Sequence, residues 1–155
     1  MIELSYAGDI FDLPGKYEAV CVTTNGVVKR NGELVMGKGI ALSAAQKYPD
    51  LPKIFGQMVS QYGNHAYMLP ATNKNGLPIH IISFPTKRHF KYNSEMSLIL
   101  QSAKEIVKMA DMYDFKKIYM VRPGCGCGKL DWHSQVKNPL SHILDDRFIV
   151  VNPNS

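Results

Sequence analysis

The 155-residue sequence has few cysteines and no long hydrophobic run. Its three cysteines are an odd number, and Cys125 and Cys127 are separated by one residue, so a secreted disulfide framework is not expected. No apolar stretch approaches the roughly 20 residues of a membrane span. The residues that follow Met1 lack the basic and apolar regions of a signal peptide. These absences favour a cytoplasmic protein that makes no membrane contact.

What the sequence does contain is the composition of a folded domain with excess positive charge. Hydrophobic residues make up 45% and charged residues 20%, which is typical of globular proteins. The length suits a single domain over residues 1–155. The net charge of +5 fits either an ordinary basic protein or a positive field that attracts a phosphate-bearing partner. Net charge alone does not separate these two interpretations.

Apolar runs of strand length alternate with helical patterns along the chain. Three runs are apolar throughout, as expected for strands buried on both faces of a sheet: 19–22, 118–121 and 148–151. Residues 79–84 also predict a buried strand. Weaker strand candidates lie at 2–6 and 66–69. Helices are expected from about residue 39, over 51–62 with Asp50 as the N-cap, from Asn93 or Ser94, and after Asp131 as a second N-cap. The alternation predicts an α/β sandwich with a largely parallel sheet, helices on both faces and a ligand beyond the carboxyl ends of the strands.

Two glycine-rich segments stand close to expected strand-to-helix junctions. The first is Gly37-Lys38-Gly39-Ile40, and the second is Gly124-Cys125-Gly126-Cys127-Gly128. Glycine lets a backbone approach a ligand closely, and a helix that begins there offers unpaired N–H groups and a positive dipole end to an anion. Together the segments predict a phosphate or nucleotide site. The alternative is that these glycines only make tight turns.

The first segment comes close to a P-loop, since Gly32, Gly37 and Lys38 match G-x-x-x-x-G-K. The next residue is Gly39 rather than Ser or Thr, so the hydroxyl that would bind Mg²⁺ is missing. The dinucleotide fingerprint fails too, because Leu42 stands where a small residue is required. We therefore expect backbone amides to bind the anion without a metal.

The cysteines of the second segment give no metal signature. Cys125 and Cys127 lack the usual zinc-knuckle spacing, and no second cysteine pair exists. Small side chains that fill a glycine-rich turn are the simpler interpretation. Neither a metal nor a cofactor is expected.

Lys87 is the lysine with the most distinctive surroundings. It follows a buried strand and Pro85, so its backbone should be well placed, and neighbouring Arg88 and His89 would favour its neutral, nucleophilic form. The alternative is that residues 87–91 form a solvated basic loop.

Taken together and in order, these motifs resemble the macrodomain family. The matching pieces are Gly8-Asp9-Ile10, Asn25 after the second predicted strand, the segment from Met36 to Leu42, and the segment from Gly124 to Trp132. Residues 84–89 and the following Ser94 resemble the DarG-like branch of ADP-ribosylhydrolases. Each piece alone is modest, but their order through nearly the whole chain is specific.

The resemblance implies a three-layer α/β/α fold with a mixed, mostly parallel sheet, and a site for ADP-ribose. It implies that Asp9 bonds the adenine amine beside the Ile10 amide, and that Asn25 meets the distal ribose. The remaining implied ligand-binding residues are Gly37, Lys38, Gly39 and Ile40 in the first segment and Gly124, Cys125, Gly126, Cys127, Gly128, Lys129 and Leu130 in the second.

The resemblance also implies that Lys87 is catalytic. Its amine could attack the anomeric carbon of the distal ribose, or the ring-opened aldehyde, and form a Schiff base that water resolves. A related branch carries an aspartate in the second loop, where this chain has Gly128. The expected activity is removal of ADP-ribose from a modified nucleobase in DNA or from a protein, by a monomer. DNA is slightly favoured by the basic residues 87–91. The alternatives are an ADP-ribose-1″-phosphate phosphatase and a module that binds ADP-ribose without turnover.

Overall fold

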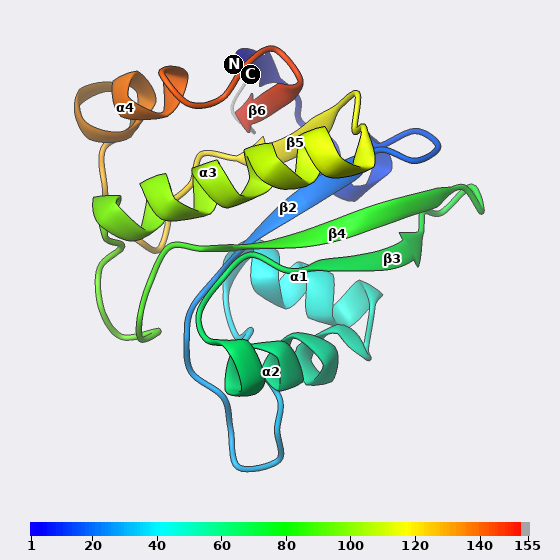
Figure 1. Cartoon of the computed structure of the whole chain (residues 1–155), viewed down its shortest axis with the longest axis vertical. Helices are drawn as coiled ribbons and strands as arrows, with labels where there is room; N and C mark the ends of the chain where they lie inside the picture. The colour runs from blue at the N-terminus through cyan, green and yellow to red at the C-terminus, as the bar shows by residue number, and fades with distance from the viewer. Residues whose placement is uncertain (153–155) are drawn as a thin grey trace.

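The computed structural model describes residues 1–152, and a six-stranded sheet forms its centre (Figure 1). The strands are β1 (Ile2–Ser5), β2 (Ala19–Thr24), β3 (Met68–Thr72), β4 (Pro78–Pro85), β5 (Ile118–Val121) and β6 (Phe148–Asn152). They are hydrogen-bonded in the order β1-β6-β5-β2-β4-β3. All neighbours run parallel except β3, which is antiparallel to β4. The predicted mixed, mostly parallel sheet is confirmed.

Helices cover both faces of this sheet. They are α1 (Gly39–Lys47), α2 (Leu51–Tyr62), α3 (Met96–Tyr113) and α4 (Lys137–Ser141), with a short 3-10 helix (Ile10–Asp12) and a π-helical turn (Trp132–Val136). Figure 1 shows α1 and α2 on one side of the sheet, and α3 and α4 on the other. The three-layer α/β/α arrangement is therefore confirmed.

Alternate residues of each central strand pack into one of two cores on opposite faces of the sheet. Ala19 and Cys21 of β2 belong to the core beneath α3, whereas Val20 and Val22 belong to the core beneath α1 and α2. Because both faces are covered, residues 19–22 of this strand are all apolar, which is the pattern that predicted it. Complete burial also raises the pKa of the Cys21 thiol, so this cysteine is a packing residue.

The strand predicted at 66–69 lies further along the chain, as β3, and it includes Pro70. A proline cannot donate to a strand ladder, so within sheets it is confined mainly to edge strands. Strand β3 is such an edge strand, paired only with β4 among the described strands. The predicted bounds were therefore wrong at both ends, since β3 begins at Met68 and continues through Pro70 to Thr72.

Helix α3 begins at Met96 and not at Asn93 or Ser94 as its pattern predicted. The residues before it bond to other parts of the chain. The Ser94 amide donates to the Gly128 carbonyl at 3.0 Å, and the Glu95 amide donates to the Thr86 carbonyl at 3.0 Å. These long-range bonds hold residue 95 extended and tie the start of α3 to the loops that follow β4 and β5.

Of the two predicted helix caps, one is made by its side chain. Asp131 accepts a hydrogen bond from the Ser134 amide at 2.8 Å, although the turn that it opens is π-helical. Asp50 stands at the start of α2, but its side chain makes no capping bond. Asp50 therefore stands at the predicted N-cap position, but its side chain does not make the capping hydrogen bond.

Gly56 of α2 packs against the segment that leads into the first glycine segment. A Cβ at this position would collide with the Gly32 carbonyl oxygen and lie 2.8 Å from the Leu34 amide nitrogen. We predict that Gly56→Ala lowers the free energy of unfolding by about 2 kcal/mol or more, because these backbone atoms cannot rotate away. This loss should exceed the gain of about 1 kcal/mol in helix propensity. Urea denaturation measures the difference.

The control is Gly37→Ala, since a Cβ at Gly37 meets nothing within 4 Å. It should change the free energy of unfolding by less than about 1 kcal/mol. Equal stability of Gly56→Ala and the unchanged protein would contradict the close packing of α2 on residues 32–34.

Candidate functional site

Three parallel neighbours, β5, β2 and β4, end at the same edge of the sheet, and the residues at their ends line one cavity. Thr24 and Asn25 come from the end of β2, Thr86 and Lys87 follow β4, and Arg122 follows β5. The two glycine segments, 37–40 and 124–129, complete the walls. The cavity measures about 980 Å³. It lies beyond the carboxyl ends of the strands, where the sequence predicts that a ligand binds.

The charged side chains that line this cavity are all positive. Its cationic residues are Lys38, Lys87, Lys91, Arg122 and Lys129, and none of the described lining residues is Asp or Glu. Charges of one sign along a concave wall reinforce one another and raise the local concentration of counter-ions. The cavity therefore suits an anionic ligand.

Lys87 crosses from the end of β4 to the second glycine segment. Its Nζ donates a hydrogen bond to the Cys127 carbonyl at 3.1 Å. Its own carbonyl accepts a bond from Asn64 Nδ2 at 3.1 Å, and the preceding Thr86 amide donates to the Thr24 carbonyl at 3.0 Å. The backbone of Lys87 is thus fixed on a strand end, which favours accurate placement of its amine.

The two residues after Lys87 have other partners. Arg88 Nε bonds both carboxylate oxygens of Glu95, at 3.1 and 3.0 Å. The His89 ring stacks on Phe90, with centroids 4.3 Å apart. Lys87 lines the cavity while Arg88 forms an ion pair beside it, so residues 87–91 are not a uniformly solvated basic loop. The predicted influence of Arg88 and His89 on the protonation of Lys87 stays a prediction.

Asn25 is buried and organises the chain that leads to the first glycine segment. Its Nδ2 donates to the Val35 carbonyl at 2.9 Å, and its Oδ1 accepts from the Val27 amide at 2.9 Å. The side chain therefore joins the two ends of residues 27–35. Nδ2 carries a second hydrogen, so Asn25 can hold this loop and still donate to a ligand.

A cluster that includes the first strand holds Arg122 at the cavity. Glu3 accepts hydrogen bonds from Lys137 Nζ at 2.7 Å and from Trp132 Nε1 at 2.9 Å, and these bonds lower the pKa of Glu3. The Arg122 guanidinium lies 5.4 Å from the centre of the Trp132 ring and 3.9 Å from Glu3. Arg122 is thereby fixed between an aromatic ring and a carboxylate.

Cys125 of the second segment does not provide an activated thiol. Burial raises the pKa of Cys125 to about 11, so its thiol is protonated near neutral pH. Its Sγ lies 3.5 Å from the Pro123 carbonyl. In residues 1–152, no group of three or more His, Cys, Asp or Glu side chains is placed to hold a metal ion.

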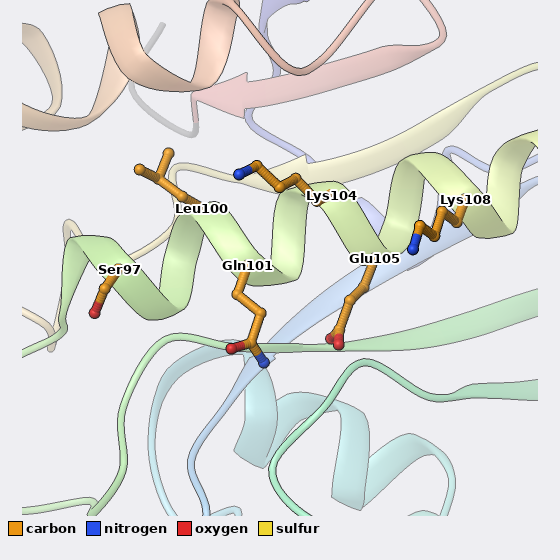
Figure 2. Close-up of a pocket in the computed structure, with 6 residues that line it drawn as sticks. All are labelled: Ser97, Leu100, Gln101, Lys104, Glu105 and Lys108. Carbon is orange, nitrogen blue, oxygen red and sulfur yellow. The ribbon is translucent and has the colours of Figure 1, made fainter.

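A second, smaller depression of about 470 Å³ lies on the surface of α3 (Figure 2). Its lining residues all belong to this one helix: Ser97, Leu100, Gln101, Lys104, Glu105 and Lys108. Glu105 is already engaged, with His65 Nδ1 at 2.7 Å and the Ala66 amide at 2.9 Å. Because no loop or strand end contributes to this depression, the cavity at the strand ends is the candidate site.

None of the helices described is both long and apolar enough to span a lipid bilayer.

Comparison with curated proteins gives relatives of modest identity. No protein-family model matches the chain. A DNA ADP-ribosyl glycohydrolase of Mycobacterium tuberculosis is 28% identical over 126 residues, which are 78% of this chain and 36% of that protein. A DNA ADP-ribosyl glycohydrolase of Thermus aquaticus is 26% identical over 140 residues, which are 89% of this chain and 36% of that protein. The chain thus spans about a third of the length of these relatives.

Solved structures agree with the fold over nearly the whole chain. The macrodomain of Mycobacterium tuberculosis DarG has a TM-score of 0.75 and 23% identity, and the match covers 99% of both chains. The macrodomain of Thermus aquaticus DarG has a TM-score of 0.76 and 24% identity, and the match covers 97% of both chains. The chain has the macrodomain fold. The resemblance to DarG-like macrodomains is confirmed.

Most of the predicted ligand-binding residues lie around one cavity. Asn25, residues 37–40 and residues 124–129 line it together with Lys87. Asp9, Ile10 and Leu130 are not among its described lining residues, and Leu130 packs against the core beneath α3. The binding and catalytic roles of all these residues stay predictions.

Asp9 lies at the far end of α1 from the glycine segment. Its Oδ2 pairs with Lys47 Nζ at 2.7 Å, and its Oδ1 accepts the Phe11 amide at 3.0 Å. Partial burial raises the pKa of Asp9, but the bonds from Lys47 and Phe11 outweigh that effect and lower it overall. Asp9 is therefore an ionised carboxylate, and each of its oxygens already has one partner.

The cavity is also lined by residues for which no ligand role was predicted. They include Thr23, Thr24, Thr86, Tyr92, Asn93 and Arg122. Thr24, Thr86 and Arg122 stand at or just beyond the ends of predicted strands, so the strand-end rule could have found them. No local signal marks Asn64, whose role depends on the folded position of Lys87.

Gly128 is a position in the second glycine segment that has no room for a side chain. A Cβ there would collide with Ser94 Oγ and lie 2.5 Å from the Gly124 carbonyl oxygen. We predict that Gly128→Ala costs about 2 kcal/mol of stability in urea denaturation. It should also displace the loop, so that a thiol reagent labels the half-buried Cys125 faster.

Gly126→Ala is the matched control, because a Cβ at Gly126 meets nothing within 4 Å. It should leave the stability and the labelling rate of Cys125 nearly unchanged. If both variants behave alike, the close approach of Gly128 to Ser94 and Gly124 does not exist in solution.

Proposed function

We propose that this macrodomain is an ADP-ribosyl glycohydrolase that removes ADP-ribose from a modified nucleobase in DNA, with Lys87 as the nucleophile. The observation that carries the proposal is the position of Lys87. Its Nζ reaches the second glycine segment, inside a cavity whose described lining includes cations and no carboxylate.

The diphosphate of ADP-ribose fits the two glycine segments. Helix α1 begins at Gly39, so its free N–H groups and the positive end of its dipole face the cavity. Lys38 and Lys129 add positive charge from the two sides. A volume of about 980 Å³ is at the upper end of the range of roughly 300–1,000 Å³ for small-molecule sites.

The adenosine would extend along α1 toward Asp9. From Gly39 to Lys47 the helix rises by about 12 Å, at roughly 1.5 Å per residue. An extended dinucleotide-like ligand can cover such a distance when its diphosphate lies at the start of the helix. Asp9, paired with Lys47, would then accept the adenine amine as the family resemblance implies.

Lys87 would break the glycosidic bond in balanced steps. The neutral amine attacks the anomeric carbon, the C–N bond to the nucleobase breaks, and the base leaves with a proton from the new ammonium. The C1–O4 bond of the ribose then breaks, the ring oxygen takes the remaining proton of the nitrogen, and a Schiff base forms. Water adds to this carbon, the carbinolamine collapses, and the free amine is released with ADP-ribose. The net change is the addition of one water molecule.

DNA is the acceptor that the comparisons favour. The curated relatives carry the name DNA ADP-ribosyl glycohydrolase. A Thermosipho africanus DarTG structure in complex with ADP-ribose has a TM-score of 0.78 and 24% identity, over 97% of this chain and 41% of that one. These proteins support the ligand and the acceptor that we propose here.

The lysine mechanism makes a specific prediction for Lys87→Arg. Arginine keeps the positive charge and a donor for the Cys127 carbonyl, but it does not form a Schiff base. We predict a loss in kcat of about 10³-fold or more on ADP-ribosylated DNA, while the Kd for ADP-ribose changes less than about threefold. Borohydride added during turnover should attach ADP-ribose covalently to Lys87 of the unchanged protein, as peptide mass spectrometry would show.

Lys53→Arg, at an exposed position on α2, is the control and should keep full activity and the borohydride adduct on Lys87. Full activity of Lys87→Arg would exclude the lysine mechanism. Parallel assays with ADP-ribosylated protein and ADP-ribose-1″-phosphate test the acceptor. Turnover of the phosphate ester alone would replace the proposal with a phosphatase, and binding without any turnover would replace it with a binding module.

A further inference from the structure

The loop between β4 and α3 (Figure 1) carries three aromatic side chains that contact one another. The His89 ring lies between Phe90, with centroids 4.3 Å apart, and Tyr92, with centroids 5.2 Å apart. Phe90 is 42% exposed and Tyr92 is 60% exposed. Both line the cavity that contains Lys87. We call Phe90, His89 and Tyr92 the aromatic row.

Burial does not explain the two outer rings of this row. Exposed aromatic side chains lose the hydrophobic gain that normally retains them in a folded protein. The loop backbone is instead held by other bonds, from the Tyr92 amide to the His89 carbonyl at 3.1 Å and from the Lys91 amide to His89 Nδ1 at 3.1 Å. The loop therefore supports the rings, and both side chains remain exposed to a partner.

The charge around the aromatic row is positive. The Lys91 ammonium lies 6.0 Å from the centre of the Phe90 ring. Lys87 and Lys129 line the same cavity, and Arg88 is neutralised by Glu95. Residues 86–94 contain no Asp or Glu. Aromatic rings that alternate with cations are the features by which proteins bind single-stranded nucleic acid, since bases stack on the rings and phosphates face the cations.

We propose that the aromatic row binds the single-stranded DNA that flanks the modified nucleotide, stacking its bases on Phe90 and Tyr92. This inference rests on the proposed function, which determines where the released nucleobase leaves the cavity. The group released from the anomeric carbon must leave beside Lys87, and Phe90, Lys91 and Tyr92 line the same cavity as Lys87. A paired duplex keeps its bases stacked on one another, so the strand that stacks on the aromatic row is single.

The test compares two substrates with the same modified base: an ADP-ribosylated nucleoside and a single-stranded oligonucleotide with the modified base in its middle. The unchanged protein should show a kcat/KM for the oligonucleotide at least about tenfold above that for the nucleoside. In Phe90→Ala/Tyr92→Ala this ratio should fall close to one. Phe90→Tyr/Tyr92→Phe keeps both rings and should restore the ratio.

Tyr62→Ala is the matched control, because Tyr62 is 60% exposed, like Tyr92, and lies on α2 outside the cavity lining. It should retain the oligonucleotide preference. A ratio near one in the unchanged protein would overturn the inference, and so would a preference that survives in Phe90→Ala/Tyr92→Ala. A preference for ADP-ribosylated peptide over ADP-ribosylated amino acid that is lost in the double variant would assign the row to protein and also overturn it.

A separate measurement distinguishes this inference from the proposed function. If the unchanged protein hydrolyses neither DNA substrate, the proposed hydrolase activity fails. Fluorescence anisotropy with an unmodified single-stranded oligonucleotide then tests the row by itself. Binding that weakens about tenfold or more in the double variant supports the row, and equal binding by the double variant, or no binding by the unchanged protein, overturns it.

Discussion

The parallel register of β5, β2 and β4 positions the candidate site. In this register Thr24 of β2 stands beside Pro85 of β4, and the ladder continues by one bond, from the Thr86 amide to the Thr24 carbonyl. Asn25 and Lys87 are therefore the first residues beyond a continuous hydrogen-bonded edge. Each such bond contributes only about 1 kcal/mol, but the ladder as a whole leaves both residues little freedom to shift. The loops can vary around a fixed pair of strand ends.

Several site residues serve the folded structure before they meet any ligand. Asn25 uses both ends of its amide on backbone groups of residues 27 and 35, and Lys87 bonds the Cys127 carbonyl. Gly128 leaves the space that Ser94 Oγ occupies. The fold itself limits which residues these positions accept. Short motifs in a fixed order therefore indicated the fold, although the identity to the compared proteins is only 23–28%.

The sequence predicted what local patterns determine. The four buried strands were recognisable because both faces of the sheet are covered, and α2 was recognisable from its amphipathic spacing. The start of α3 was not, because the bonds from Ser94 and Glu95 to Gly128 and Thr86 compete with helix formation and involve residues distant in the chain. The same reason hides Arg122, whose position depends on Glu3 in the first strand and on Trp132. Local patterns predict elements, whereas such contacts exist only after the chain has folded.

The charges around the cavity limit the chemistry available to it. Most glycosidases use two carboxylates that flank the scissile bond, roughly 5–9.5 Å apart. None of the described residues that line this cavity is Asp or Glu. The carboxylates nearest in sequence to its loops are engaged, Glu95 with Arg88 and Asp131 with the Ser134 amide. Cys125 stays protonated because burial raises its pKa to about 11. The described lining therefore lacks the carboxylate pair of most glycosidases, which agrees with the lysine attack that we propose, and Lys87 is held in place at a strand end.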